Sequence, residues 1–420
     1  MDIEWHDAGV NDKLPTVAAL GTAQTLAWAS SYYVPAVLAV PMAHDLGVAP
    51  PTVFAAFSAA LLVSAALGPH AGQAIDRWGG RVVLIGTNLV FASGLVALAA
   101  AQGPWSLFAA WAILGVGMGS GLYEAAFAAL VRLYGSGSRG AITGITLIAG
   151  FASTVGWPLS ALLESNVGWR GACLAWTALH LVAGIPLNAM IPRAGPALAP
   201  RRADPPSSTS AAQTPQRASM LLAIAFATTW FVSTAMAAHL PELLQASGVT
   251  LAVAVGVGAL VGPAQVAGRV LEFGVLRHVH PLLSARLAAL LHPLGAVALS
   301  VVGGPAAAVF AVLHGAGNGI LTIAKGTLPL VLFGPQGYGH RQGRLMVPAR
   351  IAQALAPWLF GVLLERWGAH AIWFSAAAGL LAFVSLALLR APPAQRVAAM
   401  DAVAADDDGQ VVTAAARPGR

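Results

Sequence analysis

Long apolar segments separated by short polar loops dominate this sequence and leave few folds open to it. Hydrophobic residues make up 57% of the 420 residues and charged residues only 9%, whereas an ordinary soluble domain is about 25% charged. Twelve membrane-spanning helices of about 20 residues need roughly 240 residues, which is about the number of hydrophobic residues here. Because a segment in lipid must satisfy its own backbone hydrogen bonds, these segments are predicted to be helices. The sequence predicts an all-α integral membrane protein and excludes a water-soluble enzyme.

The predicted spans fall into two sets of six, separated by a segment of different composition. That segment, residues 192–218, is rich in Pro, Ser and Arg and is predicted to be a cytoplasmic linker. We expect an N-terminal tail over 1–15, six-helix bundles over 16–191 and 219–390, and a disordered tail over 391–420. The twelve predicted spans are 16–40, 52–71, 82–101, 105–130, 140–163, 170–191, 219–243, 250–268, 281–303, 305–330, 345–364 and 370–390.

Basic residues in the short loops predict the orientation of the chain in the membrane. If the N-terminus lies inside, most of the 22 Lys and Arg residues fall on the inner side, and only Arg170 and Arg366 fall outside. They are scattered in ones and twos, so they do not form the concentrated basic stripe that nucleic acid needs. We therefore predict a multi-pass protein of the cell inner membrane with both termini in the cytoplasm and no nucleic-acid partner.

The two halves of the chain resemble each other at a spacing of about 200 residues. Segment 68–81 matches segment 262–277 with an offset of 196 residues, which places Asp76 opposite Glu272. A common offset in separate segments predicts two bundles related by pseudo-twofold symmetry, as in transporters whose site lies between two repeats. In the fourth and tenth predicted helices, the residues matched at an offset of 198 are Gly117, Gly119 and Gly121 with Gly315, Gly317 and Gly319.

Residues 72–81, with the sequence GQAIDRWGGR, lie between the second and third predicted helices. They resemble the loop signature Gly-x-x-x-Asp-Arg-x-Gly-x-Arg of the major facilitator superfamily, and the resemblance extends over about residues 15–392. The resemblance implies twelve helices in two bundles, secondary transport by alternating access, and a cytoplasmic latch between the halves; a solvated loop is the alternative for this segment. The predicted latch residues, with their partners in the second repeat, are Gly72, Asp76, Arg77, Gly79, Arg81, Glu272 and Arg277.

Residues 115–156 are similar to the monocarboxylate and oxalate/formate porters of this superfamily. The similarity lies in a glycine-rich fourth helix, an inner loop with tyrosine and arginine, and a glycine-rich fifth helix. Residues 21–24 depart from the acidic-glycine opening of that group, and residues 156–158 keep only a fragment of an antiporter motif. The resemblance favours a small organic anion as the substrate.

Polar side chains inside predicted spans are costly in a membrane and are therefore candidates for function. Such residues recur on one face of the first helix and on one face of the tenth helix. A helix that lines a watery cavity accounts for such a stripe, whereas a helix buried in lipid does not need one. The predicted substrate-path residues are Gln24, Trp28, Tyr32, Tyr123, Glu124, His314, Asn318, Thr322, Lys325 and Arg350.

Glu124 and Lys325 are predicted at similar depth in the inner half of the membrane, one in each repeat. One hypothesis is that they meet as an inner gate; another is that Lys325 binds an anionic substrate while Glu124 takes the coupling proton. A fixed ion pair that neutralises two buried charges is the structural alternative. Arg350 is expected either to add positive potential to the cavity or to reach the inner surface.

These residues predict a secondary active transporter of a small solute, with a small organic anion favoured and protons as the coupling ion. The alternative is a proton-coupled efflux antiporter for drugs or toxic compounds, with Glu124 sensing a cation. An enzyme, a cofactor and a metal site are not predicted, since the chain has one cysteine, Cys173, and no histidines at ligand spacing. The expected partners are the substrate, a proton and the lipid bilayer, and the expected functional unit is a monomer.

Overall fold

In the computed structural model, all regular secondary structure of the described residues is helical. The structure describes residues 13–194, 214–276 and 279–390. Within these ranges α-helices are joined by short 3-10 and π segments, and no strand occurs. The prediction of an all-α chain is therefore confirmed.

The N-terminal half begins with α2 (Leu14–Ala29) and ends with α10 (Ile185–Ala189). Between them lie α3 (Val34–Leu46), α4 (Pro50–Trp78), α5 (Gly80–Ala99), α6 (Pro104–Gly121), α7 (Tyr123–Tyr134), α8 (Arg139–Ala149) and α9 (Ala152–Leu179). The C-terminal half begins with α11 (Pro215–Ala246) and ends with α17 (Ile372–Leu388). Between them lie α12 (Leu251–Gly258), α13 (Val261–Gly274), α14 (Pro281–Val302), α15 (Ala307–Phe333) and α16 (Tyr338–Trp367).

Nine segments of the described residues are long and apolar enough to cross a membrane, and two of them contain more than one crossing. The segment Pro104–Ala189 divides into three passes, at the turn after Tyr134 and at Gly168, whose φ of 70° interrupts α9. The segment Tyr338–Leu388 divides into two passes at Gly368. The described residues therefore make twelve passes, six in each half, as the predicted fold class requires.

The helices next to the predicted tails and linker begin earlier than expected. α2 begins at Leu14 and α11 at Pro215, since proline is well tolerated in the first turn of a helix. Residues 215–218, predicted as linker, are therefore helical. Most of the predicted linker and both predicted tails lie outside the described residues.

Four spans that were predicted as continuous helices are broken in the middle, including the fifth at residues 150–151 and the eighth at residues 259–260, and two of the breaks concern the site. The first span is interrupted by a turn at residues 30–33, between α2 and α3. The fourth span is interrupted at Leu122, which is extended with φ −83° and ψ −166°. A break frees backbone groups inside the span, and the Gln24 side-chain amide donates to the Gly121 carbonyl over 2.7 Å. The breaks in the first and fourth spans lie beside residues that were predicted for the substrate path.

Alternate glycines allow the fourth and tenth spans to pack closely against two neighbours each. In α6, Gly115 and Gly119 lie against α4 and Gly117 lies against α5, so that a Cβ at any of them would crowd or overlap the neighbouring helix. In α15, Gly315 and Gly319 lie against α13 and Gly317 lies against α14 in the same way.

Equivalent glycines are therefore 200 residues apart, and the offset of 198 taken from the sequence is wrong. A Gly-x-Gly run matches itself two residues further along, so both offsets fit the letters equally well. Two residues correspond to about 200° around a helix, which would exchange the two neighbouring helices. The contacts of Gly115 and Gly315 with equivalent helices, α4 and α13, decide the register.

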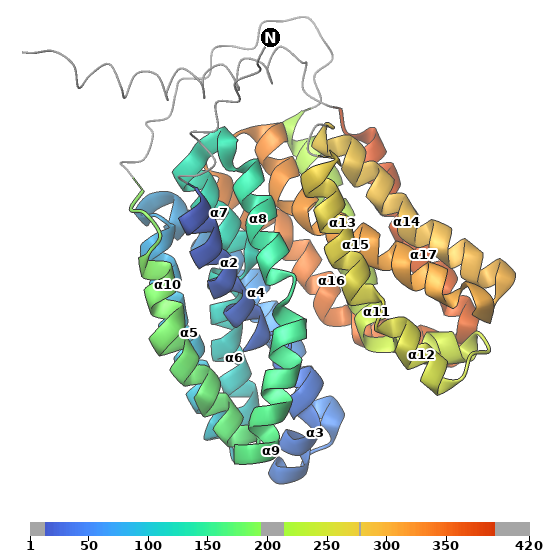
Figure 1. The fold of residues 1–420 in the computed structure, drawn as a ribbon, viewed down its shortest axis with the longest axis horizontal. Helices are drawn as coiled ribbons and strands as arrows, with labels where there is room; N and C mark the ends of the chain where they lie inside the picture. Colours follow the sequence, from blue (N-terminus) through green and yellow to red (C-terminus); the bar gives the residue numbers. More distant parts are fainter. Residues whose placement is uncertain (1–12, 195–213, 277–278, 391–420) are drawn as a thin grey trace, which may run out of the picture.

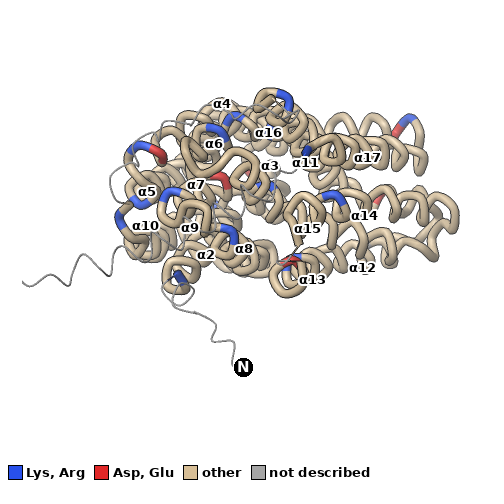
Figure 2. Tube along the Cα trace, turned by 90° about the horizontal axis from the view of Figure 1, so that it is seen from above, with Lys and Arg blue, Asp and Glu red and all other residues tan. Residues whose placement is uncertain are grey.

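The two halves lie side by side, in contact at one end and diverging toward the other (Figure 1). Ala194, just before the linker, lies beside Gly79 in the turn between α4 and α5, at the contacting end, named here the linker end. The helix pairs that join the halves include α4 with α16 and α8 with α13. Along the trace, Lys, Arg, Asp and Glu are few and scattered (Figure 2).

Candidate functional site

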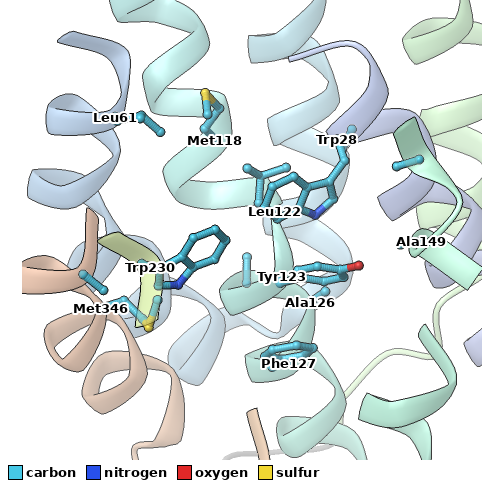
Figure 3. Packing of buried hydrophobic residues seen from close by; sticks show 14 of the residues in the cluster. Trp28, Leu61, Met118, Leu122, Tyr123, Ala126, Phe127, Ala149, Trp230 and Met346 are labelled. Atoms are coloured by element: carbon cyan, nitrogen blue, oxygen red, sulfur yellow. The ribbon is translucent and has the colours of Figure 1, made fainter. Parts of the chain in front are cut away.

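Aromatic side chains from both halves meet beside the broken first and fourth spans. The Trp28 ring centroid lies 5.1 Å from that of Tyr32 and 4.9 Å from that of Tyr123. Trp230 of α11 lies 6.4 Å from Trp28, and the two ring planes are parallel within 9°. Figure 3 shows Trp230 on one side of this group and Trp28 with Tyr123 on the other. Trp28, Tyr32, Tyr123 and Trp230 together form the aromatic cluster.

Lys325 of α15 brings a positive charge to the aromatic cluster. Its ammonium lies over the Trp230 ring, 3.9 Å from the centroid, and the residue is only 4% exposed. Among the described residues it forms no ion pair and donates no hydrogen bond. A buried charge without an ionic partner is costly, and a cation–π contact compensates only part of that cost. The site therefore holds a positive charge that is available to an anion.

Glu124 pairs with Arg350 and not with Lys325. Arg350 Nη2 on α16 donates to Glu124 Oε2 on α7 over 2.8 Å, so the ion pair joins the two halves. The predicted gate made by Glu124 and Lys325 is therefore not formed in this structure, because an arginine from the eleventh span binds the carboxylate. Arg350 is 3% exposed, which also contradicts the expectation that it reaches the membrane surface.

A hydrogen-bonded chain continues from this ion pair to the first span. Arg350 Nη1 donates to Gln353 Oε1 over 2.9 Å, and Gln353 Nε2 donates to the Tyr32 hydroxyl over 2.9 Å. Gln353 is fully buried, so neither of its polar atoms has water as an alternative partner. The chain Glu124–Arg350–Gln353–Tyr32 thus ties α16 to α7 and to the turn between α2 and α3 in the other half.

The other polar residues of the tenth span lie elsewhere. His314 is buried within the C-terminal half, with Nδ1 3.1 Å from His292 Nδ1, and Asn318 lines the same small interior crevice. Thr322 donates through Oγ1 to the Asn318 carbonyl over 2.8 Å. Lys325 alone of this stripe contacts the aromatic cluster. His314 and Asn318 thus find their surroundings within the C-terminal half, and the path along the whole stripe stays a prediction.

Asp76 and Gly72 join the halves at the linker end. Asp76 accepts hydrogen bonds from the backbone N–H groups of Gly339 and His340, both over 2.9 Å, in the first turn of α16. Gly72 lies so close that a Cβ on it would overlap the Gly339 carbonyl. A carboxylate at the start of a helix satisfies free N–H groups and meets the positive end of the helix dipole. Asp76 therefore caps a helix of the other half.

The remaining predicted latch residues of this segment stay within the N-terminal half. Arg77 is exposed, which agrees with the alternative prediction that this segment is a solvated loop. Gly79 has a φ of 83° and lets the chain turn from α4 into α5. Arg81 donates to the Ile191 carbonyl over 3.4 Å. Gly72 and Asp76 are thus the members of the segment that contact the C-terminal half.

Glu272, in the repeated segment, also lies at a contact between the halves. It is buried on α13 and pairs with Arg139 of α8 at 3.3 Å. One turn away, Arg269 Nη1 donates to the Thr146 carbonyl of α8 over 3.3 Å. The acidic residues of the two repeated segments therefore serve similar contacts. Arg277, predicted with them, lies outside the described residues.

His280 lies beside this contact, at the N-terminus of α14. Its Nδ1 accepts a hydrogen bond from the Leu282 N–H over 3.1 Å, and the Val279 carbonyl accepts one from Arg139 over 3.2 Å. Partial burial, and then the charges of Arg139 and Arg286, lower the pKa of His280 below its ordinary value of 6.5. The imidazole is thus held neutral, as its role as a helix cap requires.

Four residues of the site were not predicted from the sequence: Trp230, Gln353, Arg139 and Arg269. A single Trp or Gln in an apolar span has no periodicity to mark it. One signal was present for Gln353, because it follows Arg350 by three residues and so shares its helix face. Arg139 and Arg269 were used only as basic loop residues in predicting the membrane orientation. Their partners could not be predicted, because those partners depend on how the halves pack.

Residues 20–324 match the Major Facilitator Superfamily. This match covers more than half of the chain, and the fold has the twelve passes in two bundles that the superfamily implies. The chain therefore belongs to the Major Facilitator Superfamily. It is a multi-pass membrane protein of the secondary-transporter class.

Similar proteins agree with this assignment. A relative from Thermoproteus tenax, described as an uncharacterized 38 kDa protein in the 23S RNA operon, is 30% identical over 344 residues, or 80% of this chain and 84% of that protein. The solved human organic anion transporter MFSD10 (TETRAN) has a TM-score of 0.66 at 16% identity, covering 89% of this chain and 99% of that one. The E. coli fucose:proton symporter FucP has a TM-score of 0.67 at 14% identity, covering 88% and 97%. A FucP structure in the outward conformation reaches 0.69 with the same identity and coverage. These structures show a shared fold.

Proposed function

We propose that this chain carries a small organic anion, such as a monocarboxylate, across the cell inner membrane by alternating access coupled to protons. The observation that carries the proposal is Lys325, a buried ammonium at the contact between the halves without an ionic partner. Glu124 and Arg350 neutralise each other, so Lys325 leaves one net positive charge at the site. A monoanion supplies the missing partner through a charge-assisted hydrogen bond. The human protein of similar fold is described as an organic anion transporter.

The proposed orientation places the linker end and both termini in the cytoplasm. Its support is the excess of basic residues in the loops at that end. In this orientation the structure is outward-facing, because contacts such as Asp76 with Gly339 hold the linker end together while the halves diverge at the other end (Figure 1). The path lies between two halves of one chain, so a monomer suffices for transport.

Protons are the proposed coupling ion because Glu124 supplies a carboxylate at the centre of the site. Protonation of Glu124 would remove the charge that holds Arg350, and the guanidinium would become available to the substrate carboxylate. Loss of this ion pair would also weaken the contact between α7 and α16, which favours separation of the halves there. FucP, which has a similar fold, is described as a proton symporter.

Proton-coupled efflux of a drug or other toxic compound is the alternative. Aromatic rings attract cations, but the acid that would sense a cation, Glu124, is already paired with Arg350. Lys325 would repel a second cation at the same place. Among the described residues, no group of three or more His, Cys, Asp or Glu side chains is arranged to hold a metal ion. The proposal is therefore transport of an anion.

Counterflow into proteoliposomes tests the proposal. Liposomes containing the purified protein are loaded with unlabelled benzoate or pyruvate, and entry of the same labelled anion is followed with wild type, K325M and K13M. The chain has two lysines, so K13M is a matched control for the loss of a lysine charge. We expect K325M to lower anion exchange at least about tenfold and K13M to leave it unchanged, because one charged contact is worth roughly 1.5–3 kcal/mol.

Folding is checked by thermal unfolding of each variant, and K325R serves as a second variant that keeps the charge. If K325M exchanges the anion at the wild-type rate, Lys325 is not part of the anion site. A wild-type protein that exchanges lipophilic cations and neither carboxylate would favour the efflux alternative. A proton gradient that leaves anion uptake unchanged would contradict the coupling.

A further inference from the structure

The aromatic cluster brings rings from both halves together beside Lys325, whose ammonium lies over the Trp230 ring. The chain has five tyrosines in 420 residues, and three of them have their rings within 6.2 Å of the Trp28 ring. These are Tyr32, Tyr33 and Tyr123. Trp230 faces Trp28 from the C-terminal half. This concentration of rings next to one buried ammonium goes beyond what packing of an otherwise Ala- and Leu-rich interior needs.

Two indole groups of the cluster have unused hydrogen-bond donors. Trp28 Nε1 and Trp230 Nε1 are buried and make no hydrogen bond, although the residues are only 4% and 8% exposed. A buried indole N–H normally finds an acceptor. Two unpartnered donors beside an unpaired ammonium suit a ligand that brings acceptor oxygens.

The charges of the site limit the ligand to one negative charge. Lys325 is a cation without an ionic partner, while both amino groups of Arg350 are engaged by Glu124 and Gln353. A dicarboxylate would bring a second negative charge, and Arg269, the other buried cation of the described residues at the contact between the halves, already donates to the Thr146 carbonyl. A zwitterionic amino acid would bring an ammonium to a carboxylate that Arg350 already neutralises.

We propose that the transported anion is an aryl monocarboxylate, with its carboxylate on Lys325 and its ring between Trp28 and Trp230. This inference rests on the proposed anion transport and adds the chemistry of the rest of the substrate. A planar ring contacts two parallel faces when they lie about 7 Å apart, which is twice a carbon contact distance of about 3.5 Å. The planes of Trp28 and Trp230 are already parallel within 9°, so movement of the halves apart would leave two parallel faces.

The two indoles belong to different halves, so the ring would also couple binding to closure. When the halves separate at the aromatic cluster, a gap opens between the parallel faces of Trp28 and Trp230. A substrate ring bound in this gap contacts both indoles. An aliphatic body has no flat face and would contact each indole over a smaller area. The site is therefore expected to distinguish a ring from an aliphatic body of the same size.

Competition in the counterflow assay tests this specificity. The competitors are benzoate, cyclohexanecarboxylate of similar size without a flat ring, pyruvate, the neutral amide benzamide, and the cation benzyltrimethylammonium. Aromatic pairs contribute roughly 0.5–1.5 kcal/mol beyond their buried area, which corresponds to about fivefold in affinity. We expect benzoate to compete about fivefold better than cyclohexanecarboxylate and far better than pyruvate, with little competition by benzamide or the cation.

Tryptophan variants locate the ring. W230L removes the ring beneath the Lys325 ammonium and should weaken both acids, with the half-inhibiting concentration of benzoate raised about fivefold more than that of cyclohexanecarboxylate. W230F is expected to keep most of the difference between the two acids. Trp105 is 85% exposed, so W105L is the matched control. Both acids are measured with the same protein, so a folding defect in W230L would weaken inhibition by both acids to the same extent. In that case the comparison of benzoate with cyclohexanecarboxylate is made with W28L and W230F.

The two proposals fail in different ways. Equal competition by benzoate and cyclohexanecarboxylate, or a preference for pyruvate, overturns the aryl inference while anion transport stands. If the wild-type protein exchanges no carboxylate at all, the proposal of anion transport is itself contradicted. Competition by benzyltrimethylammonium above that of benzoate overturns both.

Discussion

The guanidinium of Arg350 and the carboxylate of Glu124 meet across the interface of the two halves, with Nη2 2.8 Å from Oε2. Arg350 is 3% exposed and the Glu124 side chain 15%, so water screens the pair poorly. A buried ion pair adds little net stability over an apolar pair, but removing one partner leaves an uncompensated charge. The pair is therefore a sensitive point in the contact between α7 and α16.

Single and double neutralisation of this pair should differ in their effect on stability. R350Q leaves the buried carboxylate without its cation and is expected to lower the free energy of unfolding by about 3 kcal/mol. E124Q/R350Q removes both charges and should cost clearly less than the two single changes together. The measurement is unfolding of the purified protein in detergent, followed by tryptophan fluorescence. Strict additivity of E124Q and R350Q would show that the two side chains do not interact.

A surface ion pair within the N-terminal half supplies the control for that experiment. Arg170 and Asp45 lie 2.8 Å apart, with side chains 39% and 49% exposed. Exposed pairs are worth roughly 0–1 kcal/mol, so D45N, which leaves the hydrogen bonds of Arg170 to the Ala99 and Ala101 carbonyls in place, should cost much less than R350Q. Similar losses in both variants would argue that burial does not set the effect.

Asp76 should hold the linker end closed through its cap on α16. D76A removes both hydrogen bonds to the α16 backbone and is expected to cost about 1 kcal/mol, whereas D76N retains a good capping group and should cost less. Ser64 lines a crevice between the halves with Gly68, Gly343 and Arg350. In a C173A background, labelling of S64C by a water-soluble maleimide should be about fivefold faster with D76A.

The neighbouring arginine provides the control for the Asp76 experiment. Arg77 is exposed, so R77A should leave the labelling rate of S64C unchanged. If R77A accelerates labelling as much as D76A does, the effect comes from the loop as a whole and not from the cap.

His280 should make the protein less stable in acid. Its pKa is lower in the folded protein than its ordinary value of 6.5, so the unfolded chain binds the proton more readily. The stability that the neutral imidazole contributes is fully present above pH 6.5 and is lost as the pH falls below that value. H280N keeps a side chain able to cap α14 without titrating. We expect the fall in melting temperature from pH about 7.5 to about 5.5 to be smaller in H280N than in wild type. An equal fall in both proteins would assign the acid sensitivity to other groups.

The sequence was sufficient to predict helices, spans and the division into halves because lipid acts on each segment locally. Every apolar run must form its own hydrogen bonds and be long enough to cross. The breaks at residues 30–33 and at Leu122 were not predictable in this way, since an unwound turn has the same apolar composition as a helix. Side chains from neighbouring helices stabilise such turns, as Gln24 does at Gly121.

The sequence by itself determined that the chain is a twelve-pass membrane protein and that polar residues such as Glu124, Lys325 and Arg350 lie inside its spans. Only the tertiary structure decided that Glu124 pairs with Arg350, that Lys325 lies over Trp230, and that His314 points into its own bundle. The reason is geometric. One residue along a helix turns a side chain by about 100°, so the choice of partner depends on how each helix is rotated and placed against its neighbours.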